Sequence, residues 1–155
     1  MNENEQLIEA FYQAFQNKDW KTMKTCYSEE VMFNDSVFKN LDYYQTTKMW
    51  EMLLKRGKDL KLVFSNIEAT GSTGKATWVA TYTFSTGNKV ENHIQANFEI
   101  KDGKIIKHTD SFDFYEWAKQ AFGITGRLIG WTGFFRSKVQ TKALEGLEKY
   151  IQKNP

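Results

Sequence analysis

The sequence of 155 residues predicts an α+β fold, with helices packed on one face of an antiparallel sheet. Apolar residues recur at helical spacing in the first third of the chain and again near its end. Between them, four strand-like segments follow one another from residue 60 to residue 115 and are joined only by turn residues. Strands that are joined directly by turns pair antiparallel, so these segments predict a meander.

The overall composition limits the class of protein and partner. The net charge of +2 is small and the basic residues are scattered along the chain, so we expect no nucleic-acid partner. The first residues lack the features of a signal peptide, and nowhere do about 18 apolar residues run together, so we expect a cytoplasmic protein with no membrane partner. The single cysteine, Cys26, excludes an intrachain disulfide and a multi-cysteine metal site.

Helices are predicted in four segments. Residues 4–16 carry the apolar stripe of an amphipathic helix, and Asp19 is placed to cap a second, short helix. Residues 42–56 predict a third helix, with Gly57 as its C-cap, and residues 135–152 predict a last helix. The last helix has a basic face. Such a helix can lie on a membrane, but it more often packs on its own domain with its charges in solvent.

The Asp102-Gly103 pair predicts a type I′ turn between two strands. Because this turn pairs the residues on either side of it, counting outward sets polar side chains opposite one another on one face of the hairpin. The three predicted pairs are Asn97 with His108, Gln95 with Asp110, and His93 with Phe112.

The preceding hairpin is predicted to turn tightly at Gly87-Asn88. That register places an aromatic wall of Trp78, Tyr82 and Phe84 beside the polar patch of the next hairpin. An apolar lining with a few convergent polar groups is typical of a small-molecule pocket. An error of one residue in the register would turn the polar side chains to a solvated sheet face instead, and this alternative stays open.

A short strand from Val31 to Asp35 places Asp35 on the same face as Val31 and Phe33. Burial on an apolar wall disfavours a charged carboxylate and raises its pKa toward that of a general base at neutral pH. The other interpretation is that the Asp35 side chain caps nearby backbone. We also assign Tyr12 and Trp50, from the apolar faces of the first and third helices, to the lining of the pocket.

The outer face of the predicted sheet is moderately apolar. It is expected to carry Thr81, Thr83, Ile94, Ala96 and Phe98. A contiguous apolar surface of this kind marks an interaction site, so we expect a homodimer formed through the outer face.

Four glycines follow the sheet, at positions 123, 126, 130 and 133. The Lys and the Ser or Thr of a phosphate-binding loop do not follow them. We therefore interpret the segment as a bent connection in which the glycines allow close packing of backbone.

Three stretches of the chain resemble a known superfamily. They are FYQAF from residue 11, YSEEVMFND from residue 27 and DGKIIKHTDSFD from residue 102. With the helix and meander between them, they look like the SnoaL-like proteins of the nuclear transport factor 2-like superfamily, which includes ketosteroid isomerase, limonene epoxide hydrolase and scytalone dehydratase. The match covers about residues 5–122. It implies a cone-shaped, curved antiparallel sheet packed with helices around a pocket, in a single domain over 1–155 whose Gly-rich segment and last helix cover 123–153.

The resemblance implies roles for two carboxylates. Asp35 falls where isomerases of this superfamily keep their general-base Asp, and Asp110 looks like the acid/base Asp of SnoaL proteins. Phe11 stands where the isomerase needs an oxyanion-binding Tyr, and Gln95 lies near the place of its protonated Asp, so the resemblance does not extend to ketosteroid isomerase chemistry. The three arginines of the chain lie outside the predicted strands, which excludes the Asp-Arg-Asp arrangement of the epoxide hydrolases.

Two functions fit these residues. The first is a proton-transfer enzyme of isomerase, aldol cyclase or dehydratase type that acts on a small apolar carbonyl compound. Asp35 or Asp110 would move the proton with His108 assisting, and Gln95, Asn97 or Tyr82 would bind the oxygen. The second is a non-catalytic ligand-binding or interaction domain of the same fold. No dinucleotide fingerprint, nucleophile elbow or close-set metal motif appears, so we expect neither a cofactor nor a metal.

Overall fold

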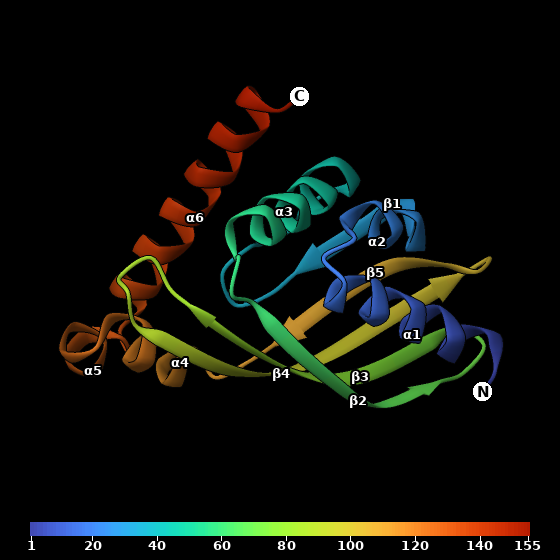
Figure 1. The fold of residues 1–155 in the computed structure, drawn as a ribbon, viewed down its shortest axis with the longest axis horizontal. Helices are drawn as coiled ribbons and strands as arrows, with labels where there is room; N and C mark the ends of the chain where they lie inside the picture. The colour runs from blue at the N-terminus through green and yellow to red at the C-terminus, as the bar shows by residue number, and fades with distance from the viewer.

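The computed structural model describes all 155 residues and has the predicted α+β architecture. The helices are α1 (Glu3–Gln16), α2 (Trp20–Cys26), α3 (Tyr43–Arg56), α4 (Phe114–Phe122), α5 (Ile124–Ile129) and α6 (Gly133–Lys153). The strands are β1 (Tyr27–Asn34), β2 (Lys61–Ala69), β3 (Thr73–Thr83), β4 (Lys89–Lys101) and β5 (Lys104–Ser111). The strands form one curved sheet in the order β1-β5-β4-β3-β2, and α1, α2 and α3 lie on one side of it (Figure 1).

The N-terminal helices begin at residues whose side chains satisfy the first backbone donors. The Asn2 side chain accepts from the N–H of Glu5, and the Glu5 side chain accepts from the N–H of Asn2. Asp42 and Gln45 form the same reciprocal pair at the start of α3, and Asp19 caps α2 as predicted. These caps hold donors that a helix start would otherwise leave without partners. The first and third predicted helices are confirmed to within one residue at each end.

Strands β2 to β5 form the predicted antiparallel meander. Asp102 and Gly103 have φ angles of 52° and 74°, and two positive values are what a type I′ turn requires. Strand β1 joins the free edge of β5 in the parallel sense, with Phe33 beside His108. This pairing brings the end of β1 next to the end of β5.

A bulge in β5 shifts the register of the last hairpin. Lys101 pairs with Lys104 as predicted, but Glu99 pairs with Lys107, which leaves Ile106 as an extra residue. One extra residue changes which side chains face each other, so the predicted pairs between these strands are wrong. His108 lies opposite Phe98, and Asp110 lies opposite Ala96.

The connection between β3 and β4 is also longer than predicted. Thr83 pairs with Lys89, so residues 84–88 form a loop where a two-residue turn was expected. This register sets Trp78 opposite Ile94. The predicted partners of Trp78, Tyr82 and Phe84 are therefore wrong as well.

The two register changes exchange the faces of β4. The side chains that face the helices are Val90, Asn92, Ile94, Ala96, Phe98 and Ile100, and all are buried. The exposed side chains are Glu91, His93, Gln95, Asn97 and Glu99. The prediction that Ile94, Ala96 and Phe98 lie on the outer face is wrong, although Thr81 and Thr83 do lie there. The outer face of β4 is polar.

The glycines after β5 allow helices to pack closely, as predicted. A Cβ atom at Gly126 of α5 would overlap the carbonyl oxygen of Ala118 in α4, and one at Gly130 would crowd the Ala118 side chain. Two short helices, α4 and α5, form here instead of an irregular connection. The absence of a side chain at Gly126 is therefore what allows α5 to turn back on α4.

Helix α6 runs from the α4 and α5 end of the molecule to α3 (Figure 1). Leu147 of α6 is fully buried in the main core, and the Tyr150 hydroxyl donates to Glu51 Oε2 of α3 at 2.5 Å. Burial and the Glu51 carboxylate raise the pKa of Tyr150 to about 12. No helix of the chain is long and apolar enough to span a membrane.

The buried side chains form two hydrophobic clusters. The larger lies between the sheet and helices α1 to α3, and it includes Leu147 of α6. The smaller consists of Val90, Phe114, Trp117, Ala118, Ala121 and Phe135. Val37, Tyr82 and Phe112 are partly buried and pack against both clusters, so they mark the seam between them.

We expect Gly126→Ala to lower the free energy of unfolding by about 1–3 kcal/mol, because the new methyl group overlaps backbone that cannot easily move. The matched control is Gly146→Ala in α6, where no atom lies within 4 Å of the new Cβ. That change should raise the free energy of unfolding by about 0.5–1 kcal/mol. Urea unfolding followed by circular dichroism measures both, and a Gly126→Ala protein as stable as the wild type would contradict the close packing.

Candidate functional site

Parallel pairing of β1 with β5 places two carboxylates side by side. Phe33 of β1 lies beside His108 of β5. Side chains two residues further along each strand point to the same face, so Asp35 follows beside Asp110. Both carboxylates face the helices, and Asp35 lies next to the seam residues Val37 and Tyr82.

A chain of hydrogen bonds runs through the buried interior to Asp110. The Trp50 Nε1–H donates to the Tyr27 hydroxyl at 3.0 Å, and the Tyr27 oxygen lies 2.7 Å from His108 Nδ1. His108 Nε2 lies 2.9 Å from Asp110 Oδ1, which also accepts from Trp78 Nε1 at 3.5 Å. All five side chains are buried, and His108 is 1% exposed.

The donors in this chain determine the tautomer of His108. The Tyr27 oxygen already accepts from Trp50, so its own O–H is free to donate to His108 Nδ1. His108 Nε2 then carries the hydrogen and donates it to the Asp110 carboxylate. A neutral imidazole in this tautomer satisfies every member of the chain, whereas a protonated one would leave the Tyr27 hydrogen without an acceptor.

Asp35 is half-buried at the seam. Its Oδ1 accepts from the backbone N–H of Val37 at 2.7 Å and of Phe38 at 2.6 Å, which is the capping role that we considered for it. Burial raises the pKa of Asp35 to about 6, the two backbone hydrogen bonds oppose this rise, and the charge of Asp110 adds to it. A carboxyl group with this pKa can both take and return a proton near neutral pH.

One oxygen of each carboxylate remains free. Asp35 and Asp110 use only Oδ1 in hydrogen bonds with the protein. Only one side-chain polar atom, the Tyr12 hydroxyl, is both fully buried and without a hydrogen-bond partner. The Oδ2 atoms of Asp35 and Asp110 also have no partner, so they are not fully buried and each keeps some accessible surface. Burial raises the pKa of Tyr12 well above its usual value, and the nearby Asp110 charge raises it further. The interior therefore holds two free carboxylate oxygens and one free hydroxyl.

Tyr82 presents a further hydroxyl close to Asp35. Its oxygen accepts from Trp117 Nε1 at 2.8 Å, which leaves its own O–H free to donate. Burial raises the pKa of Tyr82, the Trp117 hydrogen bond opposes this rise, and the Asp35 charge adds to it. Asn92, the only polar side chain on the inner face of β4, is a diagonal neighbour of Tyr82 across the β3–β4 pair.

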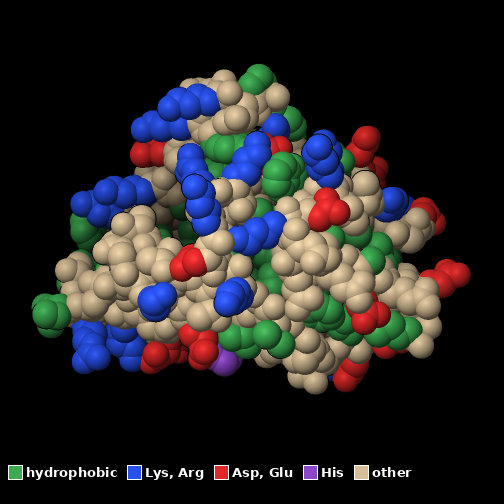
Figure 2. Space-filling model, viewed as in Figure 1, with side chains coloured by type: hydrophobic (Ala, Val, Ile, Leu, Met, Phe, Trp, Pro, Cys, Tyr) green, Lys and Arg blue, Asp and Glu red, His purple; other side chains and the backbone are tan.

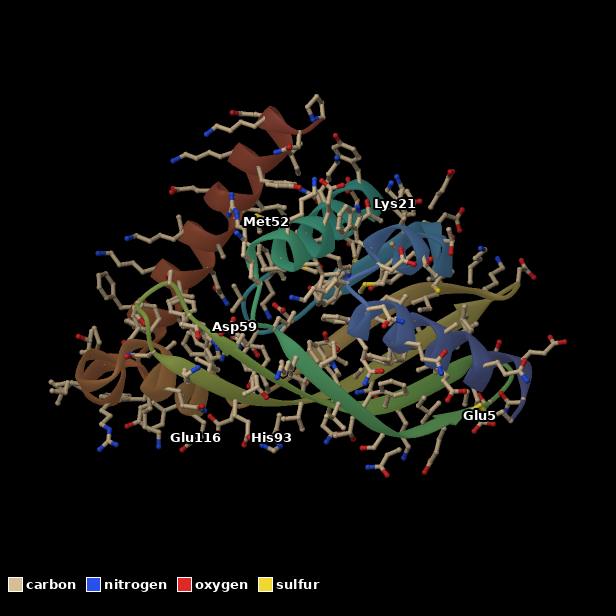
Figure 3. All side chains as sticks on the ribbon, viewed as in Figure 1. Glu5, Lys21, Met52, Asp59, His93 and Glu116 are labelled. Carbon is tan, nitrogen blue, oxygen red and sulfur yellow. The ribbon has the colours of Figure 1, made fainter.

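The structure brings most of the predicted site residues to the inner face. Asp35, His108 and Asp110 lie there together, as do the lining residues Tyr12, Trp50, Trp78, Tyr82 and Phe112. His93, Gln95 and Asn97 do not, because the bulge and the longer loop turn them outward. Figure 3 shows His93 on the side of the sheet away from the helices, where its Nε2 lies 3.1 Å from Glu91. His93 therefore cannot share a metal ion with His108 and Asp110.

Three residues of the site were not predicted: Tyr27, Asn92 and Trp117. Tyr27 has the same parity along its strand as Val31 and Phe33, which was a usable signal. Asn92 alternates in step with the apolar residues of β4, and this pattern would have placed it inside. Nothing in the sequence pointed to Trp117, whose role depends on the packing of α4 against β4.

A contact from α6 closes the seam next to Asp35. Gln140 Nε2 donates to the carbonyl oxygen of Ser36 at 3.1 Å, and the Ser36 hydroxyl donates to the carbonyl oxygen of Phe112 at 3.4 Å. The turn that carries Asp35 is thus held between α6 and the end of β5.

Much of the space around His108 is filled by aromatic rings. The rings of Phe98, Phe33 and Phe11 lie 4.5, 4.9 and 5.6 Å from it, centroid to centroid. Two surface hollows, of about 540 and 370 Å³, lie elsewhere: one on the sheet near Lys75, Asn97 and Lys107, the other beside Trp131 and Arg136. Neither includes Asp35, His108 or Asp110. The site is a compact polar cluster beside a half-buried carboxylate.

Solved structures with this fold include three proteins with 19–21% sequence identity to the chain. An LEH-like epoxide hydrolase of M. tuberculosis is 21% identical, with a TM-score of 0.64 over 77% of this chain and 90% of its own. A candidate polyketide cyclase of Xanthomonas campestris is 20% identical, with a TM-score of 0.66 over 77% and 96%. AclR, a candidate hydroxylase of Streptomyces galilaeus, is 19% identical, with a TM-score of 0.64 over 82% and 97%. At these identities the likeness shows the fold alone.

No curated protein matches the chain in sequence. The model of the SnoaL-like domain matches residues 8–108, which is more than half of the chain. This range contains α1 from Ile8 onward, α2, α3, β1 to β4 and His108, and it ends two residues before Asp110. The chain therefore belongs to the family of SnoaL-like domains.

Proposed function

We propose that this protein is a cofactor-independent proton-transfer enzyme, of isomerase, cyclase or dehydratase type, that acts on a small apolar carbonyl compound. The observation that carries the proposal is the pairing of Asp35 with Asp110, each with one bonded and one free oxygen, at an apolar seam. Two carboxylates in different environments, one buried beside an imidazole and one half-buried, are typical of acid–base sites. The solved structures of similar fold include a candidate polyketide cyclase, which agrees with this class of chemistry.

Asp35 would act as the general base. Its Oδ1 is held by two backbone N–H groups, so the Oδ2 atom can point to a substrate without loss of the turn. With a pKa of about 6, most Asp35 side chains are ionised at pH 7, yet the protonated form is stable enough to return the proton. Asp35 would take the proton from the carbon next to the carbonyl and return it to another atom of the same substrate.

Tyr82 would bind the carbonyl oxygen. As the proton leaves, negative charge develops on that oxygen, and a hydrogen-bond donor in an apolar setting stabilises it. The Tyr82 O–H is free to donate because Trp117 already fills an acceptor position on its oxygen. Asn92, beside Tyr82, would provide a second polar contact through its side-chain amide.

The buried chain would position the site and set its charge. Tyr27 fixes the tautomer of His108, and His108 orients Asp110. The Asp110 charge helps to keep the pKa of Asp35 high. His108 is 1% exposed, so we assign it a positioning role through Asp110.

The alternative function is a ligand-binding or interaction domain without catalysis. The aromatic rings packed around His108 favour it, because they leave little room beside Asp110. In that case the free Oδ2 of the half-buried Asp35 would bind a polar group of the ligand. Exchange of the α-hydrogens of a ketone in deuterated buffer separates the two functions, because only the enzyme accelerates it.

Assembly and location are proposals as well. A homodimer through the outer sheet face would now use Glu91, His93, Gln95 and Asn97, which are polar, in place of the apolar set that we first expected. Such a surface suits a weaker, hydrogen-bonded contact. A cytoplasmic location is proposed in keeping with the composition.

We expect Asp35→Asn to stabilise the protein at neutral pH. A pKa raised from 3.8 to about 6 means that the folded state holds its proton more tightly than the unfolded chain, so stability falls as the pH rises from about 4 to about 6. The Asn side chain keeps the Oδ1 acceptor and carries no charge. The free energy of unfolding at pH 7.5 should therefore rise by about 1–3 kcal/mol.

Urea unfolding at pH 3.5 and pH 7.5 checks this, since the gain should vanish at the lower pH. Asp102→Asn, in the exposed turn after β4, is the matched control, with an expected change within about 0.5 kcal/mol. A loss of stability in Asp35→Asn at both pH values would show that the carboxylate is needed for the turn. It would also show that burial of the charged carboxylate does not destabilise the folded protein.

We expect the wild-type protein to speed the exchange of α-hydrogens of small apolar ketones, such as 2-tetralone and phenylacetone, in deuterated buffer. Asp35→Asn should lower the rate by about 10²–10⁴-fold, because it removes the base. Tyr82→Phe should lower it by about 10²-fold or more, because it removes the oxyanion donor. Proton NMR measures the exchange, and the wild-type rate should rise with pH through about 6 as Asp35 ionises.

Asp102→Asn again serves as the control and should keep the full rate. Ketone binding, measured by calorimetry, should persist in Asp35→Asn. Binding without any acceleration of exchange by the wild type would favour the ligand-binding alternative, and an unchanged rate in Asp35→Asn would rule out Asp35 as the base.

A further inference from the structure

Large apolar side chains are exposed together at one end of the molecule. Five of them lie in α5, the turn after it and the start of α6: Ile124 is 78% exposed, Leu128 68%, Ile129 40%, Trp131 72% and Phe134 72%. We call residues 124–138 the α5–α6 corner, which lies at an extremity of the chain's fold (Figure 1). Exposed apolar side chains gathered in this way mark an interaction site. The corner lies outside residues 8–108, the part shared with the SnoaL-like family.

The same part of the chain carries charge of one sign. No acidic residue occurs between Glu116 and Glu145, whereas five basic residues do: Lys119, Arg127, Arg136, Lys138 and Lys142. This stretch has a charge of +5 in a protein whose net charge is +2, so the rest of the chain carries −3. Figure 2 shows Lys and Arg side chains gathered over α6. The corner and α6 together therefore form a basic end on a slightly acidic body.

Three polar groups at the turn between α5 and α6 are satisfied within the corner. The Trp131 Nε1–H donates to the carbonyl oxygen of Leu128 at 3.1 Å, and the Thr132 hydroxyl donates to that of Ile129 at 2.6 Å. The N–H of Phe135 donates to the Thr132 hydroxyl at 3.2 Å. Polar groups that are bonded internally lower the cost of leaving water, so the turn that carries Trp131 can enter an apolar medium.

We propose that the α5–α6 corner binds the surface of a bilayer that contains anionic phospholipid, which revises our expectation from the sequence of no membrane partner. Trp131 and Phe134 would enter the boundary between head groups and acyl chains, where aromatic side chains are favoured. The Lys138 Nζ lies 5.4 Å from the centre of the Phe134 ring, so a cation stands next to an inserted aromatic side chain and can reach the phosphates. Arg127, which is exposed on α5, would do the same.

The single sign of the charge favours a lipid surface over another copy of this chain. A second copy would bring its own basic corner, and like charges would oppose the contact. An anionic bilayer instead attracts the exposed cations of the stretch, Arg127, Lys138 and Lys142, and the attraction weakens with salt. The aromatic side chains protrude from a corner between two helices, which suits insertion into a soft interface.

Co-sedimentation with vesicles tests the proposal. The full chain should bind vesicles of phosphatidylcholine and phosphatidylglycerol (3:1) at least about 10-fold more tightly than vesicles of phosphatidylcholine alone. Raising the salt to about 0.5 M should remove most of that difference. The double variant Trp131→Ser/Phe134→Ser and the double variant Arg127→Gln/Lys138→Gln should each lower the affinity by about 10-fold or more.

Matched controls lie on other surfaces of the molecule. Val63→Ser removes an apolar side chain that is 68% exposed on β2, and Lys39→Gln/Lys61→Gln removes two exposed cations. Both proteins should bind vesicles like the wild type, and all variants should keep the wild-type melting temperature.

Three results would overturn the proposal. They are no binding to the anionic vesicles, equal binding to both kinds of vesicle, and equal losses in the corner and control variants. Sedimentation velocity without lipid adds a further check. Self-association that disappears in Trp131→Ser/Phe134→Ser would assign the corner to a second copy of the chain and would also overturn the lipid assignment.

Discussion

The buried hydrogen bonds that join Trp50, Tyr27, His108, Asp110 and Trp78 are the constraint on which the rest of the structure depends. A carboxylate and an imidazole inside an aromatic core are tolerated only when they are hydrogen-bonded, because an unpaired buried charge costs several kcal/mol. Here the partners come from α3, β1, β3 and β5. Helix α3 and the three strands must therefore assemble around the His108 imidazole. An error in the position of any of them would leave a polar atom without a partner.

Asp35 shows how structural and chemical roles can share one side chain. Its Oδ1 accepts the two backbone hydrogen bonds that form the turn after β1, and its Oδ2 is free to bind a ligand. The two interpretations of Asp35 that the sequence left open are therefore compatible, and the capping role is the one that the hydrogen bonds show. The turn also keeps the carboxylate at the seam, where the larger core meets the smaller cluster under α4.

Most of the fold could be predicted from local patterns, whereas the register of β4 could not be predicted from turns alone. The Asp102-Gly103 turn forms as expected, yet Ile106 adds a residue three positions after it, and residues 84–88 lengthen the preceding turn. A bulge has no strong signal of its own in one sequence. The alternation from Val90 through Ile94 and Phe98 to Ile100 was the better guide to the inner face, because burial of a whole strand outweighs the preference of one turn. His108 and Asp110 lie on the inner face, as predicted, because the side chains of β5 alternate regularly after the bulge. The exposure of Trp131 and Phe134 could not be predicted, since it depends on how α5 folds back on α4.

Gln140 of α6 holds the carbonyl group of Ser36, the neighbour of Asp35, and this contact links the basic end of the molecule to the seam. Six residues separate Phe134 from Gln140, a rise of about 9 Å along one continuous helix. A protein seated on a bilayer by its corner would thus hold the Asp35 turn at a fixed, short height above the lipid. Small apolar carbonyl compounds partition into lipid, so the bilayer would act as a reservoir that feeds the site, and the local supply of substrate would rise without any change in the site's own affinity.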